Sequence, residues 1–194
     1  MEMLLEAVRA YTPINEEEGA HFHAFFSRKT YKKNAVLLKE GEVAHELFFI
    51  VKGTLRQYFI NEKGAERTCN FAFEQEFVTD LESFSKQTKS ATHITALEPT
   101  ECLVITCKDV VACMANSTAA SAFFNRLVEL VALQNVGRIK SLLSQSPEQQ
   151  FEELIQAKPQ ILQRVPQRYI AQYLGIAPES LSRIRKRMLY PAKS

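Results

Sequence analysis

Side chains that can bind nucleic acid lie close together near the C-terminal end of the chain. Arg183 carries a planar guanidinium that can donate two hydrogen bonds to guanine O6 and N7, and Glu179 can accept one from a cytosine amino group. Ser180 can reach a base edge or a phosphate, whereas other members of the set are suited to holding the phosphate backbone. The predicted DNA-contacting residues are Gln167, Arg168, Glu179, Ser180, Ser182, Arg183, Lys186 and Arg187.

These residues belong to a stretch, QRYIAQYLGIAPESLSRIRK at positions 167–186, whose pattern predicts two helices joined by a tight turn. Ala171 is small enough to let two helices cross closely, and Gly175 can adopt the left-handed conformation that such a turn needs. We therefore expect a helix-turn-helix with helices at 167–174 and 178–188, the second of which enters the major groove. An ordinary helical hairpin is the alternative. The apolar residues expected on the buried side are Ile170, Leu174, Ile176, Leu181 and Ile184.

The charge of the chain is distributed unevenly along its length. The whole chain carries +2, but residues 164–194 carry +6, which leaves −4 on residues 1–163. A basic end on an acidic body favours a nucleic-acid-binding domain joined to another domain, because neutralised phosphates supply much of the affinity for DNA. A solvated basic tail is the alternative that charge alone leaves open.

Length and composition are typical of a soluble globular protein with two small domains. The 194 residues are 46% hydrophobic and 24% charged, values that exclude disordered and fibrous classes. No apolar run approaches the roughly 18 residues of a membrane helix, and the first residues, MEMLLEAVRA, include acids where a signal peptide has bases. We expect a cytoplasmic protein with no membrane partner.

Neither a metal site nor a catalytic site is expected. The cysteines, Cys69, Cys102, Cys107 and Cys113, form no C-x-x-C pair and have no histidines at zinc-site spacing. We expect reduced, mostly buried thiols, with an iron-sulfur or thiol redox sensor as the alternative. The chain has no nucleophile elbow, phosphate loop or paired catalytic carboxylates, so nothing favours an enzyme.

The first half of the chain has the pattern of a β domain. Short runs rich in β-branched and aromatic residues fill positions 31–108, separated by turn residues such as Gly41, Gly53 and the NEKG at 61–64. Seven or eight strands at this spacing predict a sandwich, barrel or β-roll. Before them, Asn15 and the acids that follow it should form a capping box that opens a short helix.

A long helix is predicted over residues 119–143, where apolar residues recur at intervals near 3.6 residues. A helix of about 25 residues is roughly 37 Å long. One small β domain offers too little surface for that length, so part of the helix should form a coiled-coil-like seam with a second copy of the chain. Packing of the whole stripe against its own β domain is the alternative. The residues predicted at the seam are Phe123, Leu127, Leu130 and Val131.

Two stretches together resemble the Crp/Fnr family of regulators: LLKEGEVAHELFFIVKGTLRQYFINEKGAE at 37–66 and the motif at 167–186. The resemblance covers nearly the whole chain. It implies an α+β fold, with an N-terminal β-roll (double-stranded β-helix or jelly roll) sensor, a long dimerisation helix and a C-terminal helix-turn-helix domain. The corresponding segments are 1–116, similar to a cyclic nucleotide-binding domain, 117–145 and 146–194.

The resemblance also assigns roles within the helix-turn-helix. Gly175, Glu179, Ser180 and Arg183 match the family pattern, in which the glutamate and the arginine read bases. Pro178 stands where some members have an arginine, so one base contact of those members is expected to be missing.

The sensor pocket departs from the family pattern. Members that bind a cyclic nucleotide have a Gly-Glu-Leu segment for the ribose hydroxyl and an Arg-Ser/Ala segment for the cyclic phosphate. Aspartate is shorter than glutamate, and lysine lacks the planar fork with which arginine binds phosphate, so both departures weaken a nucleotide site. A cyclic nucleotide, another small effector and no ligand all stay open. The corresponding residues here are Thr79, Asp80 and Leu81, followed by Lys89, Ser90 and Ala91.

These features predict a dimeric, sequence-specific transcription regulator that binds a palindromic double-stranded operator. RNA polymerase is a further candidate partner. The family usually has a β-hairpin wing after its recognition helix, and residues 189–194 predict that it is short or absent here. The alternative function is a cyclic nucleotide or small-molecule binding module that acts through protein-protein contacts, with a structural helix-turn-helix.

Overall fold

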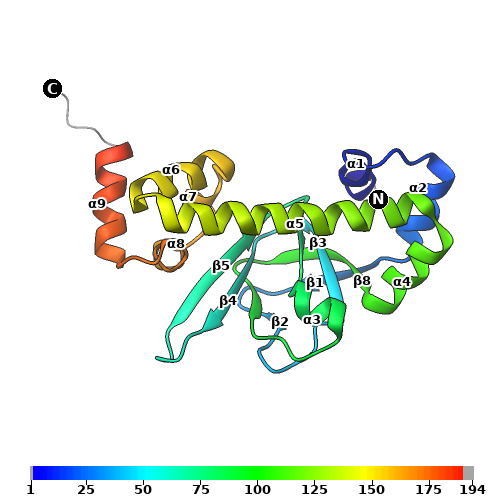
Figure 1. Ribbon diagram of the computed structural model, residues 1–194, viewed down its shortest axis with the longest axis horizontal. Coiled ribbons are helices and arrows are strands. Elements are labelled where there is room, and N and C mark those ends of the chain that lie inside the picture. Colours follow the sequence, from blue (N-terminus) through cyan, green and yellow to red (C-terminus); the bar gives the residue numbers. More distant parts are fainter. Residues whose placement is uncertain (1, 190–194) are drawn as a thin grey trace. The chain divides into compact units, whose positions relative to one another are not determined.

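The computed structural model describes residues 2–189, which form a β-roll and a set of helices (Figure 1). Eight strands lie between two N-terminal helices and a helical C-terminal part. In chain order the elements are α1 (Glu2–Arg9), α2 (Glu16–Ala24), β1 (Ser27–Tyr31), β2 (Val36–Leu38), β3 (Glu46–Lys52), β4 (Leu55–Ile60), β5 (Glu66–Ala72), β6 (Phe77–Val78), α3 (Leu81–Lys86), β7 (His93–Ala96), β8 (Thr100–Thr106), α4 (Cys107–Asn116), α5 (Thr118–Ser144), α6 (Pro147–Ala157), α7 (Ile161–Arg164), α8 (Gln167–Leu174) and α9 (Pro178–Leu189).

The strands form two four-stranded sheets, in the orders β1-β8-β3-β6 and β2-β7-β4-β5. The strand β8 pairs antiparallel with both β1 and β3, with Phe49 opposite Leu103 in the second pair. The strand β3, ELFFIVK, is buried at four consecutive positions from Leu47 to Ile50. The predicted β-roll is therefore confirmed.

The turn between β3 and β4 requires a glycine. Gly53 has φ of +107°, and a Cβ at this position would lie 2.4 Å from Thr100 Oγ1 and 2.7 Å from the Thr100 Cα. Any side chain here would collide with the β8 backbone, so this close approach fixes the corner of the roll.

The N-terminal helices cover part of the roll. Asn15 caps α2 through the predicted capping box: its side chain accepts the Glu18 N–H at 2.9 Å, and the Glu18 side chain accepts the Asn15 N–H at 3.0 Å. From α2, the Phe22 ring packs edge-on against the Phe123 ring of α5, with centroids 5.5 Å apart. The helix thereby brings an aromatic side chain to the base of α5.

The predicted long helix is present as α5, but it does not place all of the expected seam residues at a surface. Phe123 is fully buried, and Leu127 packs against the same hydrophobic core. Phe123 has no exposed surface in the single chain, where Phe22 of α2 packs against it, whereas Leu127 is half-buried, so a role of Leu127 at a seam stays a prediction. Leu130 and Val131 are half-buried, so their role at a seam stays a prediction.

The chain divides into two compact units, one with residues up to Gln57 and Phe71–Leu133, the other with Tyr58–Asn70 and residues from Gln134 onward. These units are defined by compactness alone, so they do not test the three functional segments expected from the sequence. Those segments stay a prediction. No helix among residues 2–189 is both long enough and apolar enough to cross a bilayer. The predicted short wing falls largely on residues 190–194, which lie outside the described residues.

Candidate nucleic-acid interface and ligand pocket

The two helices of the predicted helix-turn-helix are α8 and α9. Gly175 ends α8 with φ of +70°, in the left-handed region, as its place in the turn predicts. Its N–H and that of Ile176 bond back to carbonyls of the last turn of α8, which closes the helix. The small residue Ala171 is 1% exposed, as close helix packing requires.

The helix α9 has one buried side and one exposed side. Leu181 and Ile184 are buried in the helical unit, whereas Glu179, Ser182 and Arg183 are exposed. This division follows from the three-residue and four-residue spacing of the apolar positions. The side chains predicted to read bases therefore lie on the solvent side of α9.

Two basic residues of this exposed side have no acidic partner. Arg183 and Lys186 form no ion pair with any residue of the described part of the chain. Arg187, by contrast, pairs with Glu148 at the start of α6. An exposed basic side chain without an acidic partner is free to bind a phosphate or the edge of a nucleobase. Arg187 must first break its ion pair with Glu148.

The remaining predicted contacts lie on or next to these helices. Gln167 and Arg168 are exposed in the first turn of α8, where Arg168 donates to the Tyr169 hydroxyl at 2.9 Å. Ser180 is partly exposed in the first turn of α9. A shallow cavity of about 270 Å³ between α6 and α9 is lined by Ser180, Arg183 and Arg187, among others.

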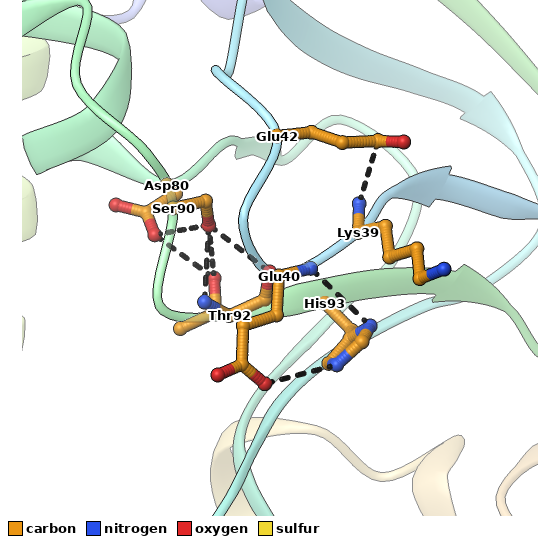
Figure 2. A network of polar contacts seen from close by, with 7 residues as sticks. All are labelled: Lys39, Glu40, Glu42, Asp80, Ser90, Thr92 and His93. Atoms are coloured by element: carbon orange, nitrogen blue, oxygen red, sulfur yellow. Dashed lines mark hydrogen bonds and ion pairs between the residues drawn. The ribbon is translucent and has the colours of Figure 1, made fainter.

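In the β-roll, the predicted ligand pocket centres on Asp80, which caps the N-terminus of α3. Its Oδ1 accepts the Ser83 N–H at 3.1 Å. Its Oδ2 accepts the hydroxyls of Ser90 at 2.6 Å and Thr92 at 3.1 Å (Figure 2). Both carboxylate oxygens of Asp80 are thus occupied by groups of the protein itself.

The second predicted segment of the pocket divides in two. Ser90 is buried, and its N–H donates to the Glu42 carbonyl at 2.7 Å. Lys89, the predicted phosphate ligand, is exposed, and its side chain bonds to no other described residue. The structure therefore brings Ser90 to Asp80 and gives Lys89 no contact with it, and Ala91 is also exposed.

The other two residues of the first segment serve the fold in part. The Thr79 hydroxyl donates to the Glu46 carbonyl at 2.9 Å, which ties the start of α3 to β3. Leu81, the first residue of α3, is partly exposed. Neither side chain shows an unsatisfied group that points to a ligand.

Gln57 and Thr92 are members of this polar cluster that sequence reasoning missed. Gln57 of β4 donates to Thr92 Oγ1 at 3.1 Å and lies 3.5 Å from the Thr79 carbonyl. The alternation of side chains along β4 was the available signal, since it places Gln57 on the face opposite its neighbour Arg56. Arg56 itself is 2% exposed.

A separate contact closes the loop after β2. The Glu40 N–H donates to His93 Nδ1 at 3.5 Å, and Glu40 Oε2 lies 3.4 Å from His93 Nε2 (Figure 2). No group of three or more metal-binding side chains occurs within residues 2–189. The His93 ring thus lies against the Glu40 carboxylate of the same compact unit.

These residues do not fit a cyclic nucleotide bound through an acid and a base. Among the described residues, the hydrogen bonds around Asp80 join one carboxylate, two hydroxyls and the Gln57 amide, and include no cation that could balance a phosphate. A phosphate placed here would face the Asp80 carboxylate, and the ribose hydroxyl would have to displace Ser90 or Thr92. The cavity of about 210 Å³ found in this unit lies instead along residues 37–48.

Two of the four cysteines are protected from ionisation. Burial raises the pKa of the Cys102 thiol to about 12, with a smaller contribution from Glu101, and raises the pKa of Cys113 to about 11. Because the thiolate is the reactive species, neither residue suits a redox sensor. Cys107 is half-buried and Cys69 is exposed.

Comparison with known proteins found one matching domain family and several solved structures with a similar fold. The family model of the cyclic nucleotide-binding domain matches residues 28–117. FixK2 from Bradyrhizobium japonicum has a TM-score of 0.74 at 13% identity and covers 84% of each chain. The catabolite activator protein of Thermus thermophilus has a TM-score of 0.61 at 18% identity, covering 94% of this chain and 86% of that one.

A protein from Eubacterium rectale, described as a transcriptional regulator of the Crp/Fnr family, has a TM-score of 0.67 at 18% identity. It covers 93% of this chain and 88% of its own. A search of curated protein sequences gave no significant match. Residues 28–117 thus match the model of the cyclic nucleotide-binding domain, and the chain as a whole shares the fold of these solved regulators.

Proposed function

We propose that the protein is a homodimeric, sequence-specific DNA-binding transcription regulator whose DNA binding does not require a cyclic nucleotide. The observation that carries the proposal is the exposed side of α9, where Arg183 and Lys186 have no acidic partner within residues 2–189, while Leu181 and Ile184 are buried on the opposite side. Arg183 would read a guanine, and Lys186 would bind a phosphate.

A second copy of the chain is the proposed partner of α5. In residues 134–144, Val136, Ile139 and Leu142 are each about half exposed, at 49%, 55% and 51%. Their spacing of three residues puts them along one side of the helix. Exposed apolar side chains in such a row are typical of a two-fold helical seam, which would present two copies of α9 to successive major grooves.

Selection from a randomised duplex pool tests the DNA-binding proposal. The purified protein is titrated at two salt concentrations, with and without cyclic AMP. We expect enrichment of a palindrome without nucleotide, with affinity that falls as salt rises. Enrichment only with cyclic AMP would refute nucleotide independence, and no enrichment in any arm would favour the alternative of a module that acts through protein-protein contacts.

Sedimentation tests the seam. Ile139→Glu should give monomers, because it places a charge in the apolar row. Lys140→Glu, at an exposed polar position of the same helix, is the matched control and should stay dimeric. Leu130→Glu tests the original expectation for the other side of α5. Monomers from Leu130→Glu and dimers from Ile139→Glu would move the seam to the side of α5 that carries Leu130.

A further inference from the structure

We propose that Arg138 is a positioning residue for DNA recognition: from α5 it holds α8, and thereby sets the orientation in which α9 meets its operator. The inference rests on the proposed function, and it concerns residues of the helical unit alone. It assigns a role to a residue that the sequence pattern does not single out.

One side chain joins three helices. Arg138 Nη1 donates to Gln150 Oε1 of α6 at 3.2 Å. Arg138 Nη2 donates to the Tyr173 carbonyl of α8, and the guanidinium carbon lies 3.9 Å from the centroid of the Tyr173 ring. The guanidinium therefore binds the backbone and the ring of the same residue.

The contacted carbonyl is in a place where a cation is well suited. Tyr173 is in the last turn of α8, where carbonyls have no donor within the helix and the negative end of the helix dipole lies. Arginine can donate in the plane of its fork and stack a ring on its face at the same time, which lysine cannot do.

The α6 end of this contact is also fixed. Gln150 is 6% exposed, and its Nε2 donates to the Gln145 carbonyl at 3.1 Å, just before α6 begins. A buried amide with both of its polar ends engaged is a rigid anchor for Arg138. The guanidinium is thus held on one side by α6 and on the other by α8.

The position of α8 decides the direction of α9. Gly175 is the turn between them, and Leu174 of α8 is buried together with Leu181 and Ile184 of α9. Arg138 also directly precedes Ile139, the centre of the proposed seam. Its contacts therefore link the part of α5 that would meet the second copy to the helix pair that would meet DNA.

Comparison of a full operator with a half operator tests this role. Affinity is measured by fluorescence anisotropy for the selected palindrome, for a duplex with one half-site, and for a palindrome with one extra central base pair. The variants are Arg138→Leu and Arg138→Lys, with Arg126→Leu as control, because Arg126 lies on α5 in an exposed pair with Glu129. Thermal unfolding by circular dichroism checks each variant.

Arg138→Leu should weaken binding of the palindrome by about tenfold while half-site affinity changes by less than about twofold. It should also bind the lengthened palindrome nearly as well as the original, because the two heads are no longer held at one spacing. Arg138→Lys should restore part of the loss, since it keeps the charge near the Tyr173 ring and loses the fork. Arg126→Leu should match the wild type.

Equal losses on the palindrome and the half-site would overturn the proposal, since they would mean damage to the helix-turn-helix itself. Unchanged affinity and unchanged spacing preference in Arg138→Leu would overturn it as well. A wild-type protein that binds none of the three duplexes refutes the proposed function instead, and this outcome is separate because it does not depend on any variant.

Discussion

Two polar regions of the molecule use similar side chains in opposite ways. Around Asp80, two hydroxyls and a backbone N–H of the β-roll donate to the carboxylate, so its hydrogen bonds are satisfied within the domain. On α9, Arg183 and Lys186 face solvent and pair with no acid in the part of the chain that the structure describes. A polar cluster that is satisfied internally stabilises a fold, whereas unpaired charges held on a rigid helix are available for a partner.

The largest expected effect is on the free energy of unfolding, when the cluster around Asp80 loses its carboxylate. Asp80→Ala removes the acceptor of three donors at once and the cap of α3, so we expect a loss of about 3 kcal/mol in the free energy of unfolding. Urea unfolding measures it. Glu82→Ala, which removes only the exposed pair with Lys86 on the same helix, should cost under about 0.5 kcal/mol. Equal stability of the two variants would show that the cluster is not structural.

The next effect concerns base reading at α9. Arg183→Ala should weaken binding to the selected operator by about 1–3 kcal/mol and relax the preference at one base pair. Its unfolding free energy should stay near the wild-type value, because Arg183 is exposed. Repeating the selection with the variant measures this, and an unchanged consensus would remove Arg183 from the base-reading set.

A smaller and uniform effect is expected at Lys186. Lys186→Ala should weaken operator and unrelated DNA alike, and should reduce the slope of log affinity against log salt by about 1. Titrations at four or more salt concentrations give the slope. Loss of affinity for the operator alone would show that Lys186 reads sequence instead of binding phosphate.

The smallest expected effect is that of a cyclic nucleotide. Saturating cyclic AMP should change operator affinity by less than about twofold, because a ligand without preferential affinity for one state shifts no equilibrium. Isothermal calorimetry on the free protein should give no binding heat. A measurable heat would show that the Asp80 cluster opens, and the difference between the two polar regions would then disappear.

Local signals in the sequence were sufficient for much of the helical architecture. The capping box at Asn15, the left-handed turn at Gly175 and the long apolar helix each depend on a few neighbouring residues, so they could be predicted without the fold. The same holds for the exposed side of α9, which follows from the spacing of Leu181 and Ile184.

Only the tertiary structure decided which groups meet over long distances in the chain. The long helix carries apolar residues on more than one side, so periodicity alone could not tell that Phe123 packs in the β-roll while Ile139 is exposed. The polar cluster around Asp80 could not be read from its own segment either, since Thr92, which donates to Asp80, and Gln57, which donates to Thr92, come from other parts of the chain. The sequence by itself determined the helix-turn-helix and a domain of short strands, because these rest on local conformation and on turn residues, whereas burial and hydrogen-bond partners depend on how the segments fold together.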